Sequence, residues 1–481
     1  MRKRIIHDIS ASSLQVIISQ LAGLILFFVT SSYLSKSVFG QLNWALAVLL
    51  VSFAVLGFGI DQITVRKIAA GEDASSYLRI YLFHVLLTGI LFLALLSSVS
   101  LISGNGYARW NLLLFLAIGQ FFTFLSLPFK QIANGKEDFR ALLFMSAGAN
   151  LIKVTGIFLL ALLHAITLDS FVLLYVLAAA AELLISIFAA RHFLNLRAGI
   201  TWDRRRYSRL IRESLPQLGV ILCSAGIARF DWIFLGIIST APVVAEYSFA
   251  YRAFEVSSLP LLVLAPLLLP RITRWFAGSD NTPLRGRRKA GLFLLARFEM
   301  ILAWGCALVL NMIWAPLVDW LTGNRYGAVN SAIFLLLSCS LPFLYINNLL
   351  WCIHFALGRM KFIFFVFMIT LLITSAGDLI LIPFFQGKGA AIAYLSAIVV
   401  QTIQFIHHRG KDRMVTGMAR LWQPLLLCGA SALISGWLAI HLHEGTVLRL
   451  LAAMGAYLVL LFASGQLRVH DWVTCKRMIY A

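Results

Sequence analysis

Apolar runs long enough to cross a bilayer recur along the whole chain, and they restrict its fold more than any other feature. About 20 apolar residues span the hydrocarbon core. Hydropathy windows of this length predict spans at 12–34, 42–62, 80–102, 110–130, 141–163, 170–190, 214–238, 247–271, 291–313, 329–356, 360–382, 388–407, 421–441 and 447–466. Because 60% of the residues are hydrophobic and only 12% are charged, the sequence predicts an all-α polytopic membrane protein with about 14 transmembrane helices.

The basic residues give the expected orientation. A net charge of +20 would ordinarily suggest a nucleic-acid partner. Here most Lys and Arg fall in the loops that are cytoplasmic when the N-terminus is placed inside, and only five fall in the outer loops. That asymmetry is typical of cytoplasmic loops in membrane proteins. We therefore expect both termini in the cytoplasm and no nucleic acid as a partner.

Several function classes lack their sequence signatures. No GxxxxGK[ST], HExxH or GxSxG motif is present, and every expected outer loop is short. The cysteines and histidines are scattered without metal-ligand spacing. The sequence therefore predicts no catalytic residues, no metal and no cofactor.

Two short patterns recur, which indicates that the chain contains two related halves. Val55–Asp73 resembles Val263–Asp280, and Ala133–Phe139 resembles Ala356–Phe362. An even number of spans in each half gives both copies the same orientation, with a substrate path expected between them. We expect an N-terminal six-helix bundle at 1–192, a basic cytoplasmic linker at 193–213, a second six-helix bundle at 214–410, and helices 13 and 14 with a cytoplasmic tail at 411–481.

Nine charged residues fall inside the predicted spans and away from their ends, where charge is costly and usually faces a bundle interior or a water-filled cavity. Four are cations that could bind an anionic substrate, and five are acids that could form ion pairs or couple ion movement: Lys153, Arg229, Arg252 and Arg297; Glu182, Asp231, Glu255, Glu299 and Asp378. Depth along the helices suggests that Lys153 lies near Glu182. It also suggests pairing of Arg229 with Glu255 and of Asp231 with Arg252, while Arg252 and Glu255 share one helix face. An equal alternative is that these charges only join neighbouring helices.

Five segments resemble the polysaccharide (O-antigen type) flippases of the superfamily that also contains multidrug extruders and lipid II flippases. They are YLSKSVFGQLNWALAV, LGFGIDQITVRKIA, QIANGKEDFRAL, ARFDWIFLG and AEYSFAYRAFE, in the order and spacing typical of that family. The resemblance implies two six-helix bundles arranged as a V around a central cavity with alternating access. Positive residues there would contact the diphosphate of the cargo, which makes Arg229 and Arg252, then Lys153, the expected contacts.

The implied function is translocation of undecaprenyl-diphosphate-linked oligosaccharide across the bacterial inner membrane for surface polysaccharide biosynthesis. A polysaccharide polymerase and a chain-length regulator are the partners that this function suggests. One alternative is a small-molecule antiporter like the multidrug extruders, although the first span carries Gln15 and Gln20 and no acid. The other is a membrane glycan polymerase or ligase, which would be expected to carry a sizeable outer loop.

Overall fold

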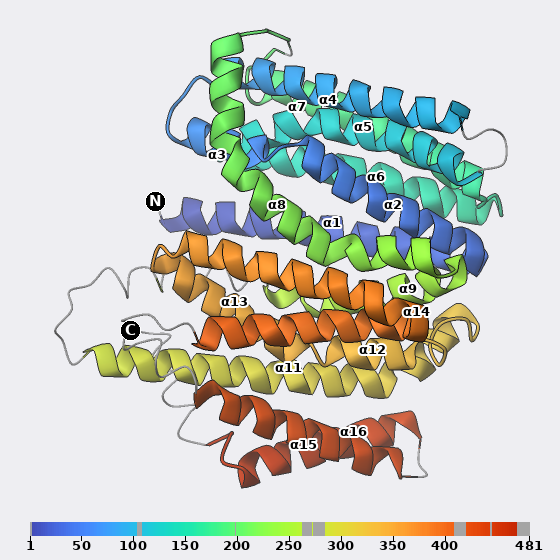
Figure 1. Ribbon diagram of the computed structural model, residues 1–481, viewed down its shortest axis with the longest axis vertical. Coiled ribbons are helices and arrows are strands. Elements are labelled where there is room, and N and C mark those ends of the chain that lie inside the picture. The colour runs from blue at the N-terminus through green and yellow to red at the C-terminus, as the bar shows by residue number, and fades with distance from the viewer. Residues whose placement is uncertain are drawn as a thin grey trace. The chain divides into compact units, whose positions relative to one another are not determined.

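The computed structural model describes residues 2–102, 108–197, 199–261, 272, 284–407, 420–442 and 445–468. Within these ranges every regular element is a helix. The chain forms two compact units, Met1–Ala245 (unit 1) and Glu246–Ala481 (unit 2), and Figure 1 shows their helices. The predicted all-α fold is confirmed.

Unit 1 contains eight complete helices in the described ranges. They are α1 (Arg2–Tyr33), α2 (Lys36–Leu56), α3 (Ile60–Ala69), α4 (Ala74–Ile102), α5 (Ala108–Gly135), α6 (Phe139–Leu162), α7 (Leu168–His192) and α8 (Arg204–Ile238). Helix α5 packs against α4 and α7, α6 packs against α1 and α7, and α8 packs against α2 (Figure 1). The buried faces of α3 to α7 form one apolar core, which includes Leu78, Ile132 and Met145.

Helix α9 (Ala241–Ser257) connects the two units in sequence, and the remaining described helices lie in unit 2. They are α11 (Leu284–Thr322), α12 (Ser331–Ser338), α13 (Leu341–Ala356), α14 (Met360–His407), α15 (Trp422–Ile440) and α16 (Thr446–Ala463). Helix α11 packs against α12, α13, α15 and α16. The last two predicted spans, α15 and α16, therefore pack on α11 as well as on each other, with Trp304, Cys428 and Tyr457 in the shared core.

The predicted spans correspond to these helices. Among the described residues, eleven helices are long and apolar enough to cross a membrane, and Ile18–Tyr33 of α1 is a shorter apolar helix. Helix α14 contains two predicted spans, because Gln386 interrupts it with φ 49° and ψ −129°. Part of the eighth predicted span, from residue 262 to 271, lies outside the described residues, as do Pro266 and Pro270.

The basic stretch after α7 is non-helical only up to Asp203. Its carboxylate accepts hydrogen bonds from the backbone N–H groups of Arg205 and Arg206, and so caps the N-terminus of α8. From Arg204 the basic residues and the seventh predicted span form one continuous helix. The sequence repeat predicts a linker at 193–213 and a second bundle that begins at 214, and both stay predictions. Contacts between residues group α8 with unit 1.

Helices α2 and α8 approach each other closely because a glycine lies at their contact. A Cβ atom at Gly236 would overlap the indole ring of Trp44. In membranes, where apolar burial gives little drive for helix association, such close approach supplies the packing energy. Gly236, on the same helix as the buried residues Arg229 and Asp231, therefore holds α8 against α2.

One of the two sequence repeats recurs as backbone geometry. In the turn after α5, the N–H of Asp138 donates to the C=O of Ala133, and Glu137 has φ 57°. In the turn after α13, the N–H of Arg359 donates to the C=O of His354, and Gly358 has φ 71°. Both are helix ends closed by a left-handed residue. Glu137 and Gly358 thus occupy the same place in this closure, two residues away from the match that the sequence suggests, and the same closure also ends α6, where the N–H of Ala165 donates to the C=O of Leu160. The Val263–Asp280 copy of the other repeat lies, apart from Ile272, outside the described residues.

Candidate functional site

Three charged side chains from three different helices meet inside unit 1. The ammonium of Lys153 on α6 lies 2.9 Å from Oε2 of Glu182 on α7. The ammonium of Lys130 on α5 contacts Oε1 of the same carboxylate. We call Lys130, Lys153 and Glu182 the unit 1 triad. The predicted proximity of Lys153 and Glu182 is confirmed, and each carboxylate oxygen has its own cation.

The helix geometry explains how the three residues meet. Lys130 lies five residues before the end of α5, Lys153 fourteen residues after the start of α6, and Glu182 ten residues before the end of α7. At 1.5 Å per residue these depths are about 8, 21 and 15 Å from the same end of the helices. Glu182 therefore lies between the two lysines in depth, and their long side chains reach it from opposite sides.

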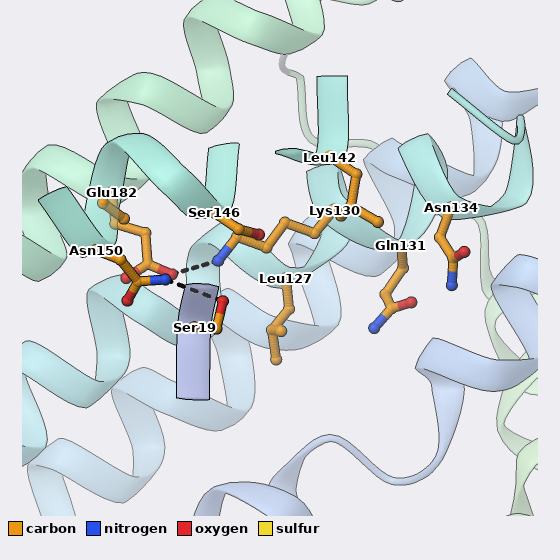
Figure 2. A pocket seen from close by; sticks show the side chains of 10 residues that line it. Ser19, Leu127, Lys130, Gln131, Asn134, Leu142, Ser146, Asn150 and Glu182 are labelled. Carbon is orange, nitrogen blue, oxygen red and sulfur yellow. Dashed lines mark hydrogen bonds and ion pairs between the residues drawn. The ribbon is translucent and has the colours of Figure 1, made fainter. Parts of the chain in front are cut away.

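The triad borders a polar pocket with a volume of about 380 Å³. Besides Lys130 and Glu182, its walls carry hydroxyl and amide groups from α1, α5 and α6: Ser19, Gln131, Asn134, Ser146 and Asn150. Figure 2 shows Lys130 pointing at Glu182, and Asn150 donating to the Ser19 hydroxyl over 3.0 Å. This combination of charge and hydrogen-bonding groups inside an apolar helix bundle marks the pocket as a candidate binding site.

The triad carries one more positive than negative charge. The side chains of Lys130 and Lys153 are 15% and 20% exposed, while that of Glu182 is only 5% exposed. The cations are thus the more accessible members of the triad. An anionic ligand entering the pocket would meet a lysine that Glu182 already holds in place.

Lys130 is the triad member that the sequence analysis missed. Hydropathy ends the fourth span at residue 130 and so assigns Lys130 to the boundary of the adjoining loop. The helix continues to Gly135, and Asp138 caps α6 by accepting a hydrogen bond from the N–H of Ala141. The Gly135 and Asp138 signals could have placed the helix end correctly, because glycine favours helix ends and aspartate favours helix starts.

Arg229 and Asp231 are both buried on α8. The guanidinium carbon of Arg229 lies 4.6 Å from the centroid of the Trp232 ring, and its Nη1 donates to the C=O of Ala228 over 2.7 Å. Oδ1 of Asp231 accepts a hydrogen bond of 2.8 Å from the N–H of Trp232. Both residues also take part in other interactions. Arg229 is therefore a cation placed on an aromatic face within unit 1.

Arg252 and Glu255 form the ion pair that their spacing on one helix face predicts. Nη1 of Arg252 lies 2.7 Å from Oε2 of Glu255 on α9, and both side chains are about one quarter exposed. Pairing of Arg229 with Glu255, and of Asp231 with Arg252, would join the two units and stays a prediction.

The remaining three predicted residues lie in unit 2. Arg297 is half-buried on α11 and has an interaction partner. Asp378 is completely buried on α14 and also has an interaction partner. Glu299 on α11 is 4% exposed, and neither of its carboxylate oxygens has a hydrogen-bond donor among the described residues.

A second pocket, of about 280 Å³, lies where the turn between α3 and α4 meets the start of α8. Lys67 lies 3.3 Å from Glu72 and 3.2 Å from Glu213. The hydroxyl of Tyr77 donates to Glu72 over 2.7 Å, and this bond, together with Lys67, lowers the pKa of Glu72. The hydrogen bond to Glu213 is the largest contribution to a raised pKa of Lys67. The positive charges of the lysine and arginines in this second pocket are balanced by the carboxylates of Glu72, Asp73 and Glu213. The pocket is therefore an ionic contact between α3, α4 and α8.

Among the described residues, no group of three or more His, Cys, Asp or Glu side chains is arranged to hold a metal ion. The chemistry available at the unit 1 pocket is therefore that of ammonium, carboxylate, hydroxyl and amide groups.

Bilayer-length apolar helices, with a charged polar pocket lined by α1, α5, α6 and α7, define a multi-span membrane protein. Residues 5–276 match the sequence model of a family described as polysaccharide biosynthesis protein. This match covers more than half of the 481 residues, and the chain belongs to that family. A search by sequence found no match among curated proteins.

Solved structures of similar fold include two groups of membrane proteins. The lipid II flippase MurJ, in an inward closed conformation, has 13% sequence identity and a TM-score of 0.72 over 93% of this chain and 97% of its own. An inward-facing multidrug resistance MATE family transporter of the MOP superfamily has 14% identity and a TM-score of 0.60 over 85% and 99%. A MOP superfamily transporter from Pyrococcus furiosus, described as having a binding pocket of reverse polarity, has 16% identity and a TM-score of 0.57 over 86% and 96%. At these identities the similarity establishes the fold.

Proposed function

We propose that this protein is a flippase that moves undecaprenyl-diphosphate-linked oligosaccharide from the cytoplasmic to the outer leaflet during surface polysaccharide biosynthesis. It does so by alternating access between its two halves, in the bacterial inner membrane and with both termini cytoplasmic. Membership of the polysaccharide biosynthesis protein family supports the pathway. The fold shared with a lipid II flippase supports the reaction type.

The observation that carries the proposal is the pair of lysines that share one carboxylate at the wall of the unit 1 pocket. Lys130 lines a cavity of about 380 Å³, and Lys153 shares with it the one acid of the cavity wall. A diphosphate is doubly charged or more, and ammonium groups bind phosphate as compact point charges. Serine, asparagine and glutamine side chains on the same walls supply hydrogen bonds to sugar or phosphate oxygens.

Glu182 has a definite role in this proposal. Two free lysines inside an apolar bundle would repel each other, and Glu182 holds them in place while the site is empty. An incoming diphosphate then replaces the carboxylate as the partner of one or both lysines. The cavity cations Arg229, Arg252 and Arg297 are further contacts along the path, and Asp231, Glu255 and Asp378 neutralise or position them.

The direct test uses a deletion strain. We expect surface glycan to be lost while lipid-linked repeat units accumulate on the cytoplasmic side. Unchanged surface glycan, in a strain without a second flippase gene, would contradict the proposal. Partner enzymes such as a polysaccharide polymerase and a chain-length regulator would be encoded beside the gene.

A reconstituted assay connects the function to the pocket. Purified protein in proteoliposomes should expose lipid-linked oligosaccharide to a membrane-impermeant glycosidase. Lys130→Met should slow this exposure at least about tenfold, since it removes a cation worth about 1.5–3 kcal/mol of charged hydrogen bonding. Gln131→Leu, on the next residue of the same wall, should cost less, roughly two- to fivefold, as expected for a neutral hydrogen bond worth about 0.5–1 kcal/mol. Equal rates for the two variants would show that the pocket does not lie on the transport path.

The second candidate is an antiporter of small organic cations, which the MATE fold similarity favours. Such a cargo would need an acid at the binding pocket without a matching cation, whereas Glu182 has two. Drug susceptibility that rises on deletion, with normal surface glycan, would support the antiporter. Longer glycan chains formed by the purified protein would instead indicate a polymerase or ligase.

A further inference from the structure

Among the acids that the sequence singled out, Glu299 is buried with no hydrogen bond or ion pair to either carboxylate oxygen from the described part of the chain. Glu182 contacts two lysines and Glu255 contacts Arg252. Asp231 and Asp378 each take part in interactions. Glu299 has no hydrogen-bond partner among the described residues, although only 4% of its surface is exposed.

The surroundings of Glu299 are apolar. Its neighbours on α11, Ala296 and Met300, are completely buried in a core that also contains Leu349 and Cys352 of α13. Tyr345, one turn away from Leu349 on the same helix, is close enough to Glu299 for the two groups to interact electrostatically, as is Cys352. Glu299 therefore lies in the α11–α13 contact, at a level between Tyr345 and Cys352.

A charged carboxylate in such a place is unfavourable. Burying an ionised group without a partner costs several kcal/mol, and the group takes up a proton instead. A metal cation would need several oxygen ligands, and α13 carries no second carboxylate to supply them. A proton needs no additional ligand. A bound proton also explains why neither carboxylate oxygen of Glu299 is paired with a cation.

We infer that Glu299 is a proton-binding site of unit 2, and that release of its proton is linked to opening of the α11–α13 contact to water. The ionised carboxylate needs hydration that the closed contact does not supply. The packed arrangement therefore binds the proton, and the opened arrangement releases it. By linkage, low pH favours the packed arrangement and high pH favours the opened one.

The titratable groups of α13 cannot replace Glu299 as the group that binds and releases a proton at this contact. The Tyr345 hydroxyl donates to the C=O of Ser257 over 3.2 Å, and His354 lies 3.3 Å from the C=O of Phe405 on α14. The groups that face Glu299 from α13 are a phenol and a thiol, and both are neutral at physiological pH.

The described residues of the other helices packed on α11 also include no group that could replace Glu299 in this role. On α11 itself, Arg297 acts on Cys428 of α15, and Cys306 is close to Tyr345. On α16, the hydroxyl of Tyr457 donates to the C=O of Ile301 over 2.9 Å. Helix α12 contains no titratable side chain. Glu299 is therefore the group at this contact whose charge depends on the opening.

Infrared difference spectroscopy of the full-length protein in lipid tests the proton directly. Raising the pH should remove a protonated-carboxyl stretching band from the wild-type protein. The band should be absent from Glu299→Gln, which resembles the protonated form in shape and charge. The same loss of intensity in Glu299→Gln as in the wild type would overturn the inference. Should the variant not fold, a wild-type spectrum without any protonated-carboxyl band would overturn it equally.

Labelling of Cys352 tests the opening. Its side chain is completely buried, so a maleimide can reach it only when α11 and α13 separate. Thiol reactivity itself rises with pH, and Glu299→Gln corrects for this because the thiol is the same. The ratio of the wild-type to the Glu299→Gln labelling rate at Cys352 should rise by up to about tenfold per pH unit over the range in which the opened arrangement has lost the proton and the packed one still holds it. A ratio that stays flat would refute the link to opening.

Two controls identify the residue and the ion that are responsible. Glu72→Gln removes an acid that already has a cation and lies outside the substrate pocket, and it should leave the band assigned to Glu299 and the labelling of Cys352 unchanged. A band that shifts with sodium concentration at fixed pH would overturn the proton in favour of sodium. Neither readout uses glycan, so a failure of oligosaccharide transport and a failure of proton binding at Glu299 are distinguishable.

Discussion

Removing the lysines of the unit 1 triad in turn should give strongly non-additive losses of stability. At 2.9 Å, a pair of unit charges at an effective dielectric constant of about 20 attracts by roughly 6 kcal/mol before desolvation is subtracted. Lys130→Met leaves Glu182 paired with Lys153, and Lys153→Met leaves it paired with Lys130. Each single change should therefore lower the free energy of unfolding by only about 1–2 kcal/mol, near the lower end of the roughly 1.5–3 kcal/mol for a hydrogen bond to a charged group, because the remaining lysine still compensates Glu182.

The double variant Lys130→Met/Lys153→Met removes every cation from Glu182. Because the side chain of Glu182 is 5% exposed, the free energy of unfolding should fall by about 3–5 kcal/mol, which is more than the two smaller single losses added together. Glu182→Gln should cost less, about 2–3 kcal/mol. The triad borders about 380 Å³ of pocket, room for roughly a dozen water molecules at about 30 Å³ each, and water there hydrates the uncompensated cations.

Reversible unfolding in mixed micelles of lipid and detergent measures these differences as a double-mutant cycle. The coupling between positions 130 and 153 should be at least about 1 kcal/mol, well beyond the roughly 0.3–0.5 kcal/mol expected for independent sites. Gln131→Leu, beside the same pocket, should change stability by less than about 0.5 kcal/mol. Additive effects of the two lysine substitutions would refute the shared-carboxylate arrangement.

Three further predictions concern the fold and its surface. Gln386→Gly should raise the thermal unfolding temperature, since it relieves a left-handed φ of 49° worth about 1–3 kcal/mol of strain, while Gln386→Ala should not. Gly236→Ala should lower the free energy of unfolding by about 1–3 kcal/mol through overlap with an indole ring, whereas Gly455→Ala, with open space around its Cα, should be neutral or stabilising. The hydrogen bond from Tyr77 lowers the pKa of Glu72, so its stabilising contribution is present at neutral pH and is lost as the pH falls through that lowered pKa. Hydrogen exchange in the turn between α3 and α4 should accelerate on acidification in the wild-type protein, and Glu72→Gln should abolish this pH dependence.

The sequence predicts the helices well because bilayer crossing leaves a strong signal. Most spans fall on described helices, although the span at 42–62 runs past the end of α2 into α3 and the span at 329–356 covers both α12 and α13. The interruption of α14 at Gln386 falls between two predicted spans. The signal fails at helix ends. Hydropathy falls before α5 ends, so Lys130 is assigned to a loop boundary, and α8 begins at Arg204, ten residues before its apolar part. Charged residues extend transmembrane helices beyond the hydrocarbon region without raising their hydropathy.

The candidate site was only partly predictable for a different reason. The depth of each residue along its helix predicts the Lys153–Glu182 contact, and spacing in the sequence predicts the Arg252–Glu255 contact. Both predictions need only the position of a residue along its helix. Which acid lacks a cation depends on the rotation of every neighbouring helix. The sequence therefore could not separate Glu299 from Asp378, although both are single acids in apolar runs.

The repeated turn shows how the two units differ in charge. When Glu137 is matched with Gly358, the position of Lys130 corresponds to Trp351, and that of Lys153 corresponds to Thr374. Conversely, Asp378 on α14 corresponds to the buried Ile157 on α6. The helices that flank the related turns thus carry cations in unit 1 and none at the same places in unit 2.

If a substrate anion is held by unit 1 and a proton by unit 2, the two ligands act on different halves, and coupling between them must pass through the relative movement of the halves. Glu299→Gln should therefore alter the pH dependence of transport with little effect on substrate affinity. Lys130→Met should lower affinity and leave the pH dependence in place. Transport rates measured over a series of substrate concentrations and pH values separate the two effects, and a loss of affinity in both variants would contradict this division between the halves.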